Sequence, residues 1–336
     1  MVLKVGGLFS GVGGIELGFQ KAGFDIAWAN EIDPKACVTY RLNHKHKLYE
    51  EDIHLLKGRD LEPVDVITGG FPCQAFSVAG YRKGFDDDRG NLFFEIMRLV
   101  EELEKKPAVL FLENVKNFSG HDGGKTLSRV ANIIQEDYGY SFFWKVLNTC
   151  DYTKLPQNRE RTFMIAFRDE VNWRLKPKNT MSAKFYKNFP PKKISSPNPV
   201  KRYIETNEID EVFYYRQDKY MYRELRKVMK SQDTLYQWRR KYVRENKSNL
   251  CPTLTANMGT GGHNVPLILT DDGIRKLTPR ECFNFQGFPK NFRFPSEIAN
   301  SHLYRQAGNS VSVPLITKLA RLIKESLVLG NNCAKI

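Results

Sequence analysis

Near the N-terminus, residues 3–23 read LKVGGLFSGVGGIELGFQKAG. The apolar run at 3–9 predicts a buried β-strand, because such strands are short and almost continuously hydrophobic. Glycines fill the turn that follows, and a helical pattern at 15–22 ends at Gly23, since glycine commonly stops a helix. A strand, a glycine-rich turn and a helix in this order predict the first unit of an α/β sheet.

The alternation of strand and helix patterns continues to about residue 170. Apolar residues recur at helical spacing through 92–103. Short apolar runs predict further strands at 26–30, 64–68, 109–112, 142–147 and 162–167. We therefore predict an α/β fold with a doubly wound, mostly parallel, Rossmann-like sheet. Beyond about residue 175, prolines, charges and tyrosines become frequent, which predicts a smaller, irregular second domain.

Positive charge is concentrated in one segment of the chain. The net charge is +14, and residues 174–247 carry 20 Lys+Arg against 8 Asp+Glu, interleaved with aromatic side chains. Such a segment predicts binding to the phosphates of a nucleic acid. The six cysteines lack metal-ligand spacing, which indicates free thiols, no metal and a cytoplasmic location. We expect neither a membrane span nor a signal peptide.

A thiol and a carboxylate each follow an apolar strand. Cys73 lies in GGFPCQAFS (69–77), directly after the strand at 64–68, and Glu113 lies in FLENV (111–115). Open α/β sheets bind ligands at the carboxyl ends of their strands, so both side chains can face one crevice. A thiol beside an acid is typical of covalent catalysis.

Two arginines occur at alternate positions of QNRER (157–161). In extended backbone, side chains two residues apart point to the same side, so Arg159 and Arg161 can reach one site. Beside Cys73 and Glu113 they would bind a pyrimidine carbonyl, orient the acid and favour the thiolate.

A second set of residues predicts a cofactor pocket. The glycines of FSGVGG (9–14) allow the backbone to approach a ligand closely. Glu31 ends the next strand, where an acid can accept hydrogen bonds from a ribose diol. Asp52 and Ile53 extend the pocket, the carboxylate toward an exocyclic amine and the isoleucine against a base. These residues predict an adenosine-containing cofactor, with NAD and S-adenosylmethionine both open.

Nine motifs occur along the chain in a fixed order. They are FSGVGG (9–14), NEID (30–33), DI (52–53), GGFPCQAFS (69–77), DDRGNLFF (87–94), ENV (113–115), QNRER (157–161), RKLTPRECFNFQGFP (275–289) and YRQAGNSV (304–311). In this order they resemble the cytosine-5 DNA methyltransferase family of bacterial restriction–modification systems. The chain departs from the family pattern at Glu51, where glycine is usual, and at 151–156, where the usual DYG run is one residue longer.

The resemblance implies that a methyl group passes from S-adenosylmethionine to carbon 5 of a cytosine flipped out of double-stranded DNA, leaving S-adenosylhomocysteine. Cys73 is expected to add to carbon 6 of the base, with Glu113 and Arg161 at its edge. The implied catalytic residues are Cys73, Gln74, Glu113, Arg159 and Arg161. The implied cofactor-binding residues are Phe9, Gly11, Gly13, Glu31, Ile32, Asp52, Ile53, Pro72, Leu92 and Asn309.

DNA contacts are expected from the segment after Cys73 and from the basic region. Arg239, Arg240 and Arg244 follow from the charge pattern, and the others from the resemblance. The expected DNA-binding residues are Ser77, Arg89, Arg239, Arg240, Arg244, Thr253, Gly259 and Gly261. The resemblance also implies three domain segments: a catalytic and cofactor-binding domain at 1–178, a target-recognition domain at 179–285 and a return segment at 286–336.

Family members of this kind act as monomers on a short site, paired with a restriction endonuclease that cuts the unmodified site. The chain is therefore expected to be a bacterial, nucleoid-associated monomer. Two alternatives keep the resemblance and change the function: a cytosine-5 methyltransferase that acts on transfer RNA, and an inactive family member that only binds DNA.

Overall fold

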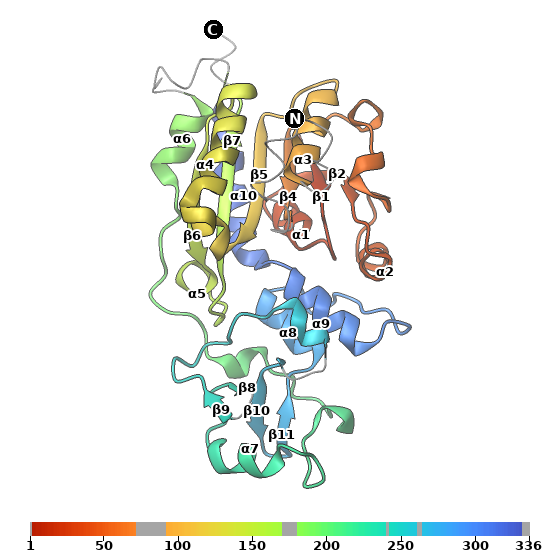
Figure 1. Ribbon diagram of the computed structural model, residues 1–336, viewed down its shortest axis with the longest axis vertical. Coiled ribbons are helices and arrows are strands. Elements are labelled where there is room, and N and C mark those ends of the chain that lie inside the picture. The colour runs from red at the N-terminus through yellow and green to blue at the C-terminus, as the bar shows by residue number, and fades with distance from the viewer. Residues whose placement is uncertain (1, 72–91, 170–179, 240–241, 261–263, 331–336) are drawn as a thin grey trace.

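The computed structural model describes residues 2–71, 92–169, 180–239, 242–260 and 264–330, which form two lobes (Figure 1). The larger lobe contains a seven-stranded sheet with helices on both faces, and the smaller lobe contains a four-stranded sheet. The predicted α/β class, with a mostly parallel sheet and a smaller second part, is confirmed. None of the described helices is long and apolar enough to cross a membrane.

The large sheet is built around its first strand. Its strands are β1 (Lys4–Leu8), β2 (Asp25–Asn30), β3 (Lys47–Tyr49), β4 (Val66–Gly69), β5 (Val109–Val115), β6 (Phe143–Asn148) and β7 (Glu160–Phe167). Their spatial order is β3-β2-β1-β4-β5-β7-β6, and only β7 runs antiparallel to its neighbours. The strand order reverses between β1 and β4, and open α/β sheets bind ligands at such a switch point.

Helices cover both faces of this sheet. They are α1 (Gly14–Lys21), α6 (Met181–Asn188) and α10 (Val313–Gly330) on one face, and α3 (Leu92–Glu102) and α4 (Lys125–Asn132) on the other. Along β5, Val109 and Phe111 pack against the helices of the first face (α1, α6 and α10), whereas Leu110 and Leu112 pack against those of the other face (α3 and α4). Because each central strand is buried on both faces, its sequence is continuously apolar.

Two elements of the large lobe have no clear periodic signal in the sequence: α2 (Pro34–Asn43) and β3. The helix begins at Asp33, whose carboxylate accepts a hydrogen bond from the Lys35 backbone N–H (2.9 Å). Its buried residues include the polar Thr39, and β3 has only three residues. A local cap therefore defines the start of α2, and pairing with β2 defines β3. A further short helix, α5 (Thr149–Tyr152), follows β6.

The smaller lobe is more regular than the sequence predicts. It contains an antiparallel sheet in the order β11-β10-β8-β9. Its elements are α7 (Tyr222–Val228), β8 (Tyr236–Arg239), β9 (Tyr242–Glu245), β10 (Leu267–Thr270) and β11 (Gly273–Lys276). Each strand has four residues, which is too short for alternation to stand out among so many charges.

Helices α8 (Pro279–Gln286) and α9 (Asn300–Asn309) lie where the two lobes meet (Figure 1). They share a core with residues of the smaller lobe, and α10 then carries the chain back onto the large sheet. Helix α6 also packs on the large sheet, although it falls within the segment 179–285 that we assigned to target recognition. The three domain boundaries remain a prediction.

Candidate active site

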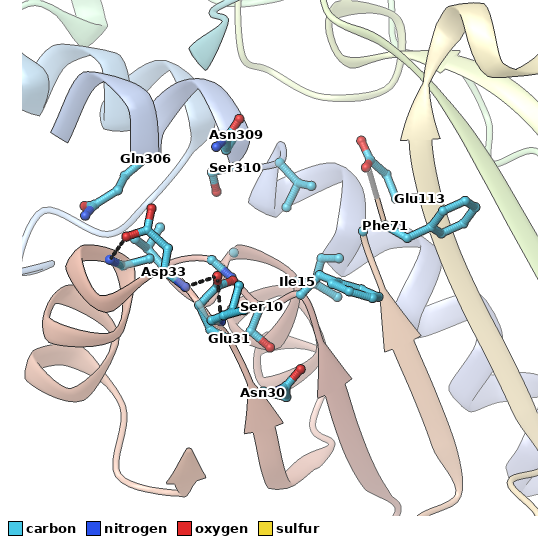
Figure 2. A pocket seen from close by; sticks show the side chains of 18 of the residues that line it. Ser10, Ile15, Asn30, Glu31, Asp33, Phe71, Glu113, Gln306, Asn309 and Ser310 are labelled. Atoms are coloured by element: carbon cyan, nitrogen blue, oxygen red, sulfur yellow. Dashed lines mark hydrogen bonds between the residues drawn. The ribbon is translucent and has the colours of Figure 1, made fainter. Parts of the chain in front are cut away.

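A cavity of about 530 Å³ opens at the carboxyl ends of β1, β2, β4 and β5. In Figure 2, Ser10 and Glu31 lie on one side, Asn309 and Ser310 face them from the end of α9, and Glu113 lies toward the far end. The predicted cofactor and catalytic residues that line it are Phe9, Gly11, Glu31, Ile32, Asp52, Ile53, Leu92, Glu113, Arg159, Arg161 and Asn309. The fold therefore brings both predicted sets to one cavity.

Glu31 is fixed by three backbone N–H groups at the mouth of the glycine turn. The Gly11 N–H donates to its Oε2 (2.7 Å), and those of Ile32 (3.0 Å) and Asp33 (2.8 Å) donate to Oε1. These bonds hold the carboxylate toward the cavity (Figure 2). Phe9 adopts a φ of 55°, which is rare for an aromatic residue and common at ligand-binding turns.

Asp52 and Ile53 form the next part of the wall. Asp52 Oδ1 accepts hydrogen bonds from the backbone N–H (3.0 Å) and ring Nδ1 (2.6 Å) of His54, and these bonds lower the Asp52 pKa. Within the described ranges, no hydrogen bond to Asp52 Oδ2 is found, so this oxygen can accept one from a ligand. Arg98 of α3 holds the segment by donating to the carbonyls of Ile53 (3.0 Å) and Leu56 (3.0 Å).

Gly13 does not line the cavity. It caps the start of α1 with a φ of 85°, and a Cβ placed there would lie 2.1 Å from Nε2 of the buried His44. His44 Nε2 also lies 3.2 Å from the Val12 carbonyl oxygen. Helix capping and close packing therefore account for glycine at this position.

Glu16 is a buried acid that our sequence reasoning missed. Ser10 Oγ, in the cavity wall, donates to Glu16 Oε1 (2.6 Å), and within the described ranges Oε2 has no partner. Burial raises the Glu16 pKa to about 7, and the Ser10 bond opposes this. The sequence signal was an acid between the apolar residues Ile15 and Phe19, both of which pack into the sheet core.

Glu113 and Arg161 form a buried ion pair at the end of β5. Arg161 Nε lies 3.1 Å from Glu113 Oε1, and β7 brings the arginine beside β5. Burial raises the Glu113 pKa, whereas Arg161 and Arg159 act to lower it. A carboxyl with a raised pKa keeps its proton to higher pH, so it can donate a hydrogen bond as well as accept one.

Asn114 fixes the chain that leads to Cys73. Its Nδ2 donates to the carbonyl of Phe71 (2.9 Å), and both residues are buried. The end of β5 therefore holds the last described residue before the segment 72–91. Of the predicted site residues, Pro72, Cys73, Gln74, Ser77, Arg89, Arg240 and Gly261 lie outside the residues that the structure describes.

Arg159 is only 2% exposed and bonds to backbone carbonyls. It donates to the carbonyls of Leu254 (2.7 Å), Gly308 (3.1 Å) and Ser310. Arg159 therefore differs from Arg161, which reaches the acid. Both arginines line the cavity, but they have different partners.

The expected DNA-binding residues are more dispersed. Arg239 and Arg244 are exposed on the β8–β9 hairpin, away from the cavity wall. Thr253 Oγ1 donates to the Asn158 carbonyl (2.6 Å), and a Cβ at Gly259 would lie 2.4 Å from the Ser301 carbonyl oxygen. Thr253 and Gly259 thus already have partners within the chain.

A Rossmann-like enzyme with an acid–arginine pair in the cavity at its strand ends is the class that this fold and cavity define. A model of the C-5 cytosine-specific DNA methylase family matches residues 3–325. The Type II methyltransferase M.Bsp6I of Bacillus sp. (strain RFL6) is 50% identical over 335 residues, covering 97% of this chain and 100% of that protein. M.HhaI of Haemophilus parahaemolyticus is 37% identical over 340 residues, covering 95% and 94%.

The crystal structure of S. pombe Dnmt2 methyltransferase superposes with a TM-score of 0.72 at 20% identity, covering 97% of this chain and 99% of that one. This likeness supports the fold alone. The family match and the two relatives show that the chain belongs to the C-5 cytosine-specific DNA methylase family, as its motifs indicated. It is accordingly a DNA (cytosine-5)-methyltransferase.

Proposed function

We propose that this enzyme methylates carbon 5 of a cytosine within a short, specific site in double-stranded DNA and protects that DNA from a paired restriction endonuclease. The observation that carries the proposal is the single cavity that joins Glu31 and Asp52 to the Glu113–Arg161 pair. One end can hold an adenosine, and the other carries groups that suit a pyrimidine edge. We also propose that it acts on DNA as a monomer.

S-adenosylmethionine fits the cavity better than NAD. The carboxylates of Glu31, Asp33 and Asp52 line the end of the cavity proposed for the cofactor, whereas Glu113 lies at the other end with Arg159 and Arg161. S-adenosylmethionine has a sulfonium, an ammonium and one carboxylate, so it carries net positive charge, whereas NAD carries a pyrophosphate. Glu31 would hold the ribose, and Asp52 Oδ2 would accept from the exocyclic amine. When bound, this group supplies a methyl electrophile and keeps the bonding electron pair on its sulfur.

The residues of this chain would prepare carbon 5 to receive the methyl group. The Cys73 thiolate adds to carbon 6, and the electron pair of the 5,6 double bond moves into the ring, which makes carbon 5 nucleophilic. Glu113, whose pKa is raised by burial, would take up a proton and donate it at the N3/N4 edge, which stabilises the developing charge. Once carbon 5 has received the methyl group, a base such as water would take the carbon 5 proton. The electron pair of that C–H bond then re-forms the 5,6 double bond, which expels the Cys73 thiolate and restores the aromatic ring.

Arg161 would serve both the acid and the base. Its contact with Glu113 orients the carboxyl, and its guanidinium also lines the cavity, where it can reach the pyrimidine carbonyl. The target base must leave the stack to enter, at a cost of a few kcal/mol. Gln74 and Ser77 are expected beside the flipped nucleotide, and Arg89, Arg239, Arg240, Arg244, Gly259 and Gly261 near the DNA.

Two experiments test the proposal. Bisulfite sequencing of plasmid from cells that express the enzyme should show one modified cytosine in one sequence context. DNA that carries 5-fluorocytosine at that position should form an adduct that survives denaturation, because the fluorine cannot leave as a proton does. Cys73→Ala should bind DNA but form no adduct and transfer no methyl group. An adduct formed by Cys73→Ala would remove the proposed nucleophile.

Two alternative functions remain: methylation of transfer RNA, and DNA binding without catalysis. The family match and the basic segment 174–247 favour active methylation of DNA. Incubation with radiolabelled S-adenosylmethionine and either plasmid or total transfer RNA separates the readings. Label in transfer RNA alone would contradict the DNA proposal, and label in neither would favour the inactive form.

A further inference from the structure

The segment 156–159, immediately before β7, is hydrogen-bonded to Cys251 and Thr253. The Cys251 N–H donates to the Pro156 carbonyl (2.6 Å), and the Asn158 N–H donates to the Cys251 carbonyl (2.8 Å). Thr253 Oγ1 adds a bond to the Asn158 carbonyl (2.6 Å). These bonds attach part of the predicted target-recognition segment to the edge of the catalytic sheet.

Arg159 extends this attachment to the cofactor side of the cavity. One nitrogen of its guanidinium bonds to the Leu254 carbonyl, and another bonds to those of Gly308 and Ser310. Gly308 and Ser310 flank Asn309, a residue of the cavity wall that faces Glu31 (Figure 2). A single planar guanidinium group therefore bridges a DNA-side segment and a cofactor-side turn.

The two segments held by Arg159 also touch directly. A Cβ at Gly308 would lie 2.1 Å from the Thr255 carbonyl carbon, so the two backbones are in close contact. Gln286 Nε2 adds a bond to the Ala307 carbonyl (2.8 Å). With Arg159 in place, a shift of Asn309 on cofactor binding must be transmitted to the backbone at Leu254 and Thr255.

We infer that Arg159 is a positioning residue that couples occupancy of the cofactor pocket to DNA binding, and not a group that acts on the cytosine. The inference rests on the proposed function, because it takes the ligands to be S-adenosylmethionine and DNA. Coupling between two sites is reciprocal: each ligand strengthens the other by the same factor, typically 5–150-fold. Arg159 is the source of this coupling because it is hydrogen-bonded both to Leu254 and to the turn at Gly308 and Ser310.

The test measures binding of S-adenosylhomocysteine, which cannot react, by equilibrium dialysis with and without sheared, unmethylated bacteriophage λ DNA. Wild-type enzyme should bind S-adenosylhomocysteine at least about fivefold more tightly with DNA present. Arg159→Lys places one ammonium where a fork reached three carbonyls, so the ratio should fall to within about twofold of one. Binding without DNA should remain.

Arg161→Lys is the matched control, because Arg161 is two residues further along the chain and contacts Glu113 instead. It should lower turnover and leave the coupling ratio at its wild-type value. If Arg159→Lys does not fold, Thr253→Val, which removes only the bond to Asn158, replaces it and should lower the ratio by about twofold or more.

The outcomes separate this inference from the proposed function. If wild-type enzyme fails to bind S-adenosylhomocysteine, the proposed cofactor is wrong. If it binds S-adenosylhomocysteine equally with and without DNA, or if Arg159→Lys or its replacement keeps the full ratio, the coupling role is wrong. A variant with the full ratio but reduced turnover would return Arg159 to the reacting base.

Discussion

Replacing Glu16 by glutamine should change how stability depends on pH. The Glu16 side chain is buried in α1, accepts a hydrogen bond from Ser10, and has no partner at Oε2 among the residues that the structure describes. Burial raises its pKa from 4.5 to about 7. The folded protein therefore holds a proton on Glu16 in a pH range where the unfolded chain has already lost it.

This difference in pKa gives the sign and the size of the change in unfolding free energy with pH. Between pH 4.5 and about 7 the folded state binds more protons, so the free energy of unfolding falls as the pH rises through this window. At 1.36 kcal/mol per pKa unit, the loss is about 3 kcal/mol once the pH exceeds 7. Glutamine is close in shape to the protonated acid and does not titrate, so Glu16→Gln should lack this loss.

Other groups titrate in the same pH range, and their contributions cancel when the variant is compared with wild type. Burial lowers the pKa values of His44 and His46 to about 4, so unfolding becomes more favourable as the pH falls below their usual value of 6.5. Their contribution has the opposite slope and is common to wild type and variant. The quantity to compare is therefore the difference in unfolding free energy between the two proteins at each pH.

Urea denaturation at pH 5 and pH 8 measures this difference. Relative to wild type, Glu16→Gln should gain about 2.5 kcal/mol between the two pH values, because the unfolded chain has already lost part of this proton at pH 5. Glu297→Gln, at an exposed position, is the matched control and should follow wild type at both. Parallel behaviour of Glu16→Gln and wild type would refute the reasoning, because it would mean that Glu16 is charged in the folded protein throughout.

Three further predictions concern one residue of the cavity wall and two residues behind it. Glu113→Gln should lower single-turnover methyl transfer by about 10²–10⁴-fold and leave S-adenosylhomocysteine binding unchanged. We expect the wild-type rate to fall as the pH rises through the raised Glu113 pKa, and this fall should be absent in the variant. Gly13→Ala should destabilise the protein by more than about 1 kcal/mol in urea denaturation, because its φ is positive and its Cβ would meet His44. Arg98→Ala, which frees the Ile53 carbonyl, should weaken S-adenosylhomocysteine binding by about tenfold in calorimetry while turnover at saturation is kept; an unchanged affinity would contradict its supporting role.

Several parts of the fold could be read from local pattern. The central strands are short and apolar, and their helices have clear stripes, so chain order and fold class followed from periodicity. The small lobe and α2 could not be read in this way. The strands of the small lobe have four residues each, and α2 depends on a cap at Asp33 and on contacts with other elements.

In the candidate site, too, some residues could be predicted from local pattern and others could not. Glu31, Asp52 and Glu113 sit at or just beyond strand ends, and that position was enough to place them in one cavity. The partners of Arg159 could not be inferred, because they lie 95 to 151 residues away along the chain. Glu16 gave a signal only as an acid on an apolar helix face.

The amino-acid sequence by itself determined the succession of strands and helices, the family, and the residue types available for chemistry, because periodicity, turns and motifs are properties of neighbouring residues. Only the tertiary structure decided which groups each polar side chain meets. That choice depends on burial and on segments far apart in the chain: the same arginine spacing places Arg161 on an acid and Arg159 on three carbonyls.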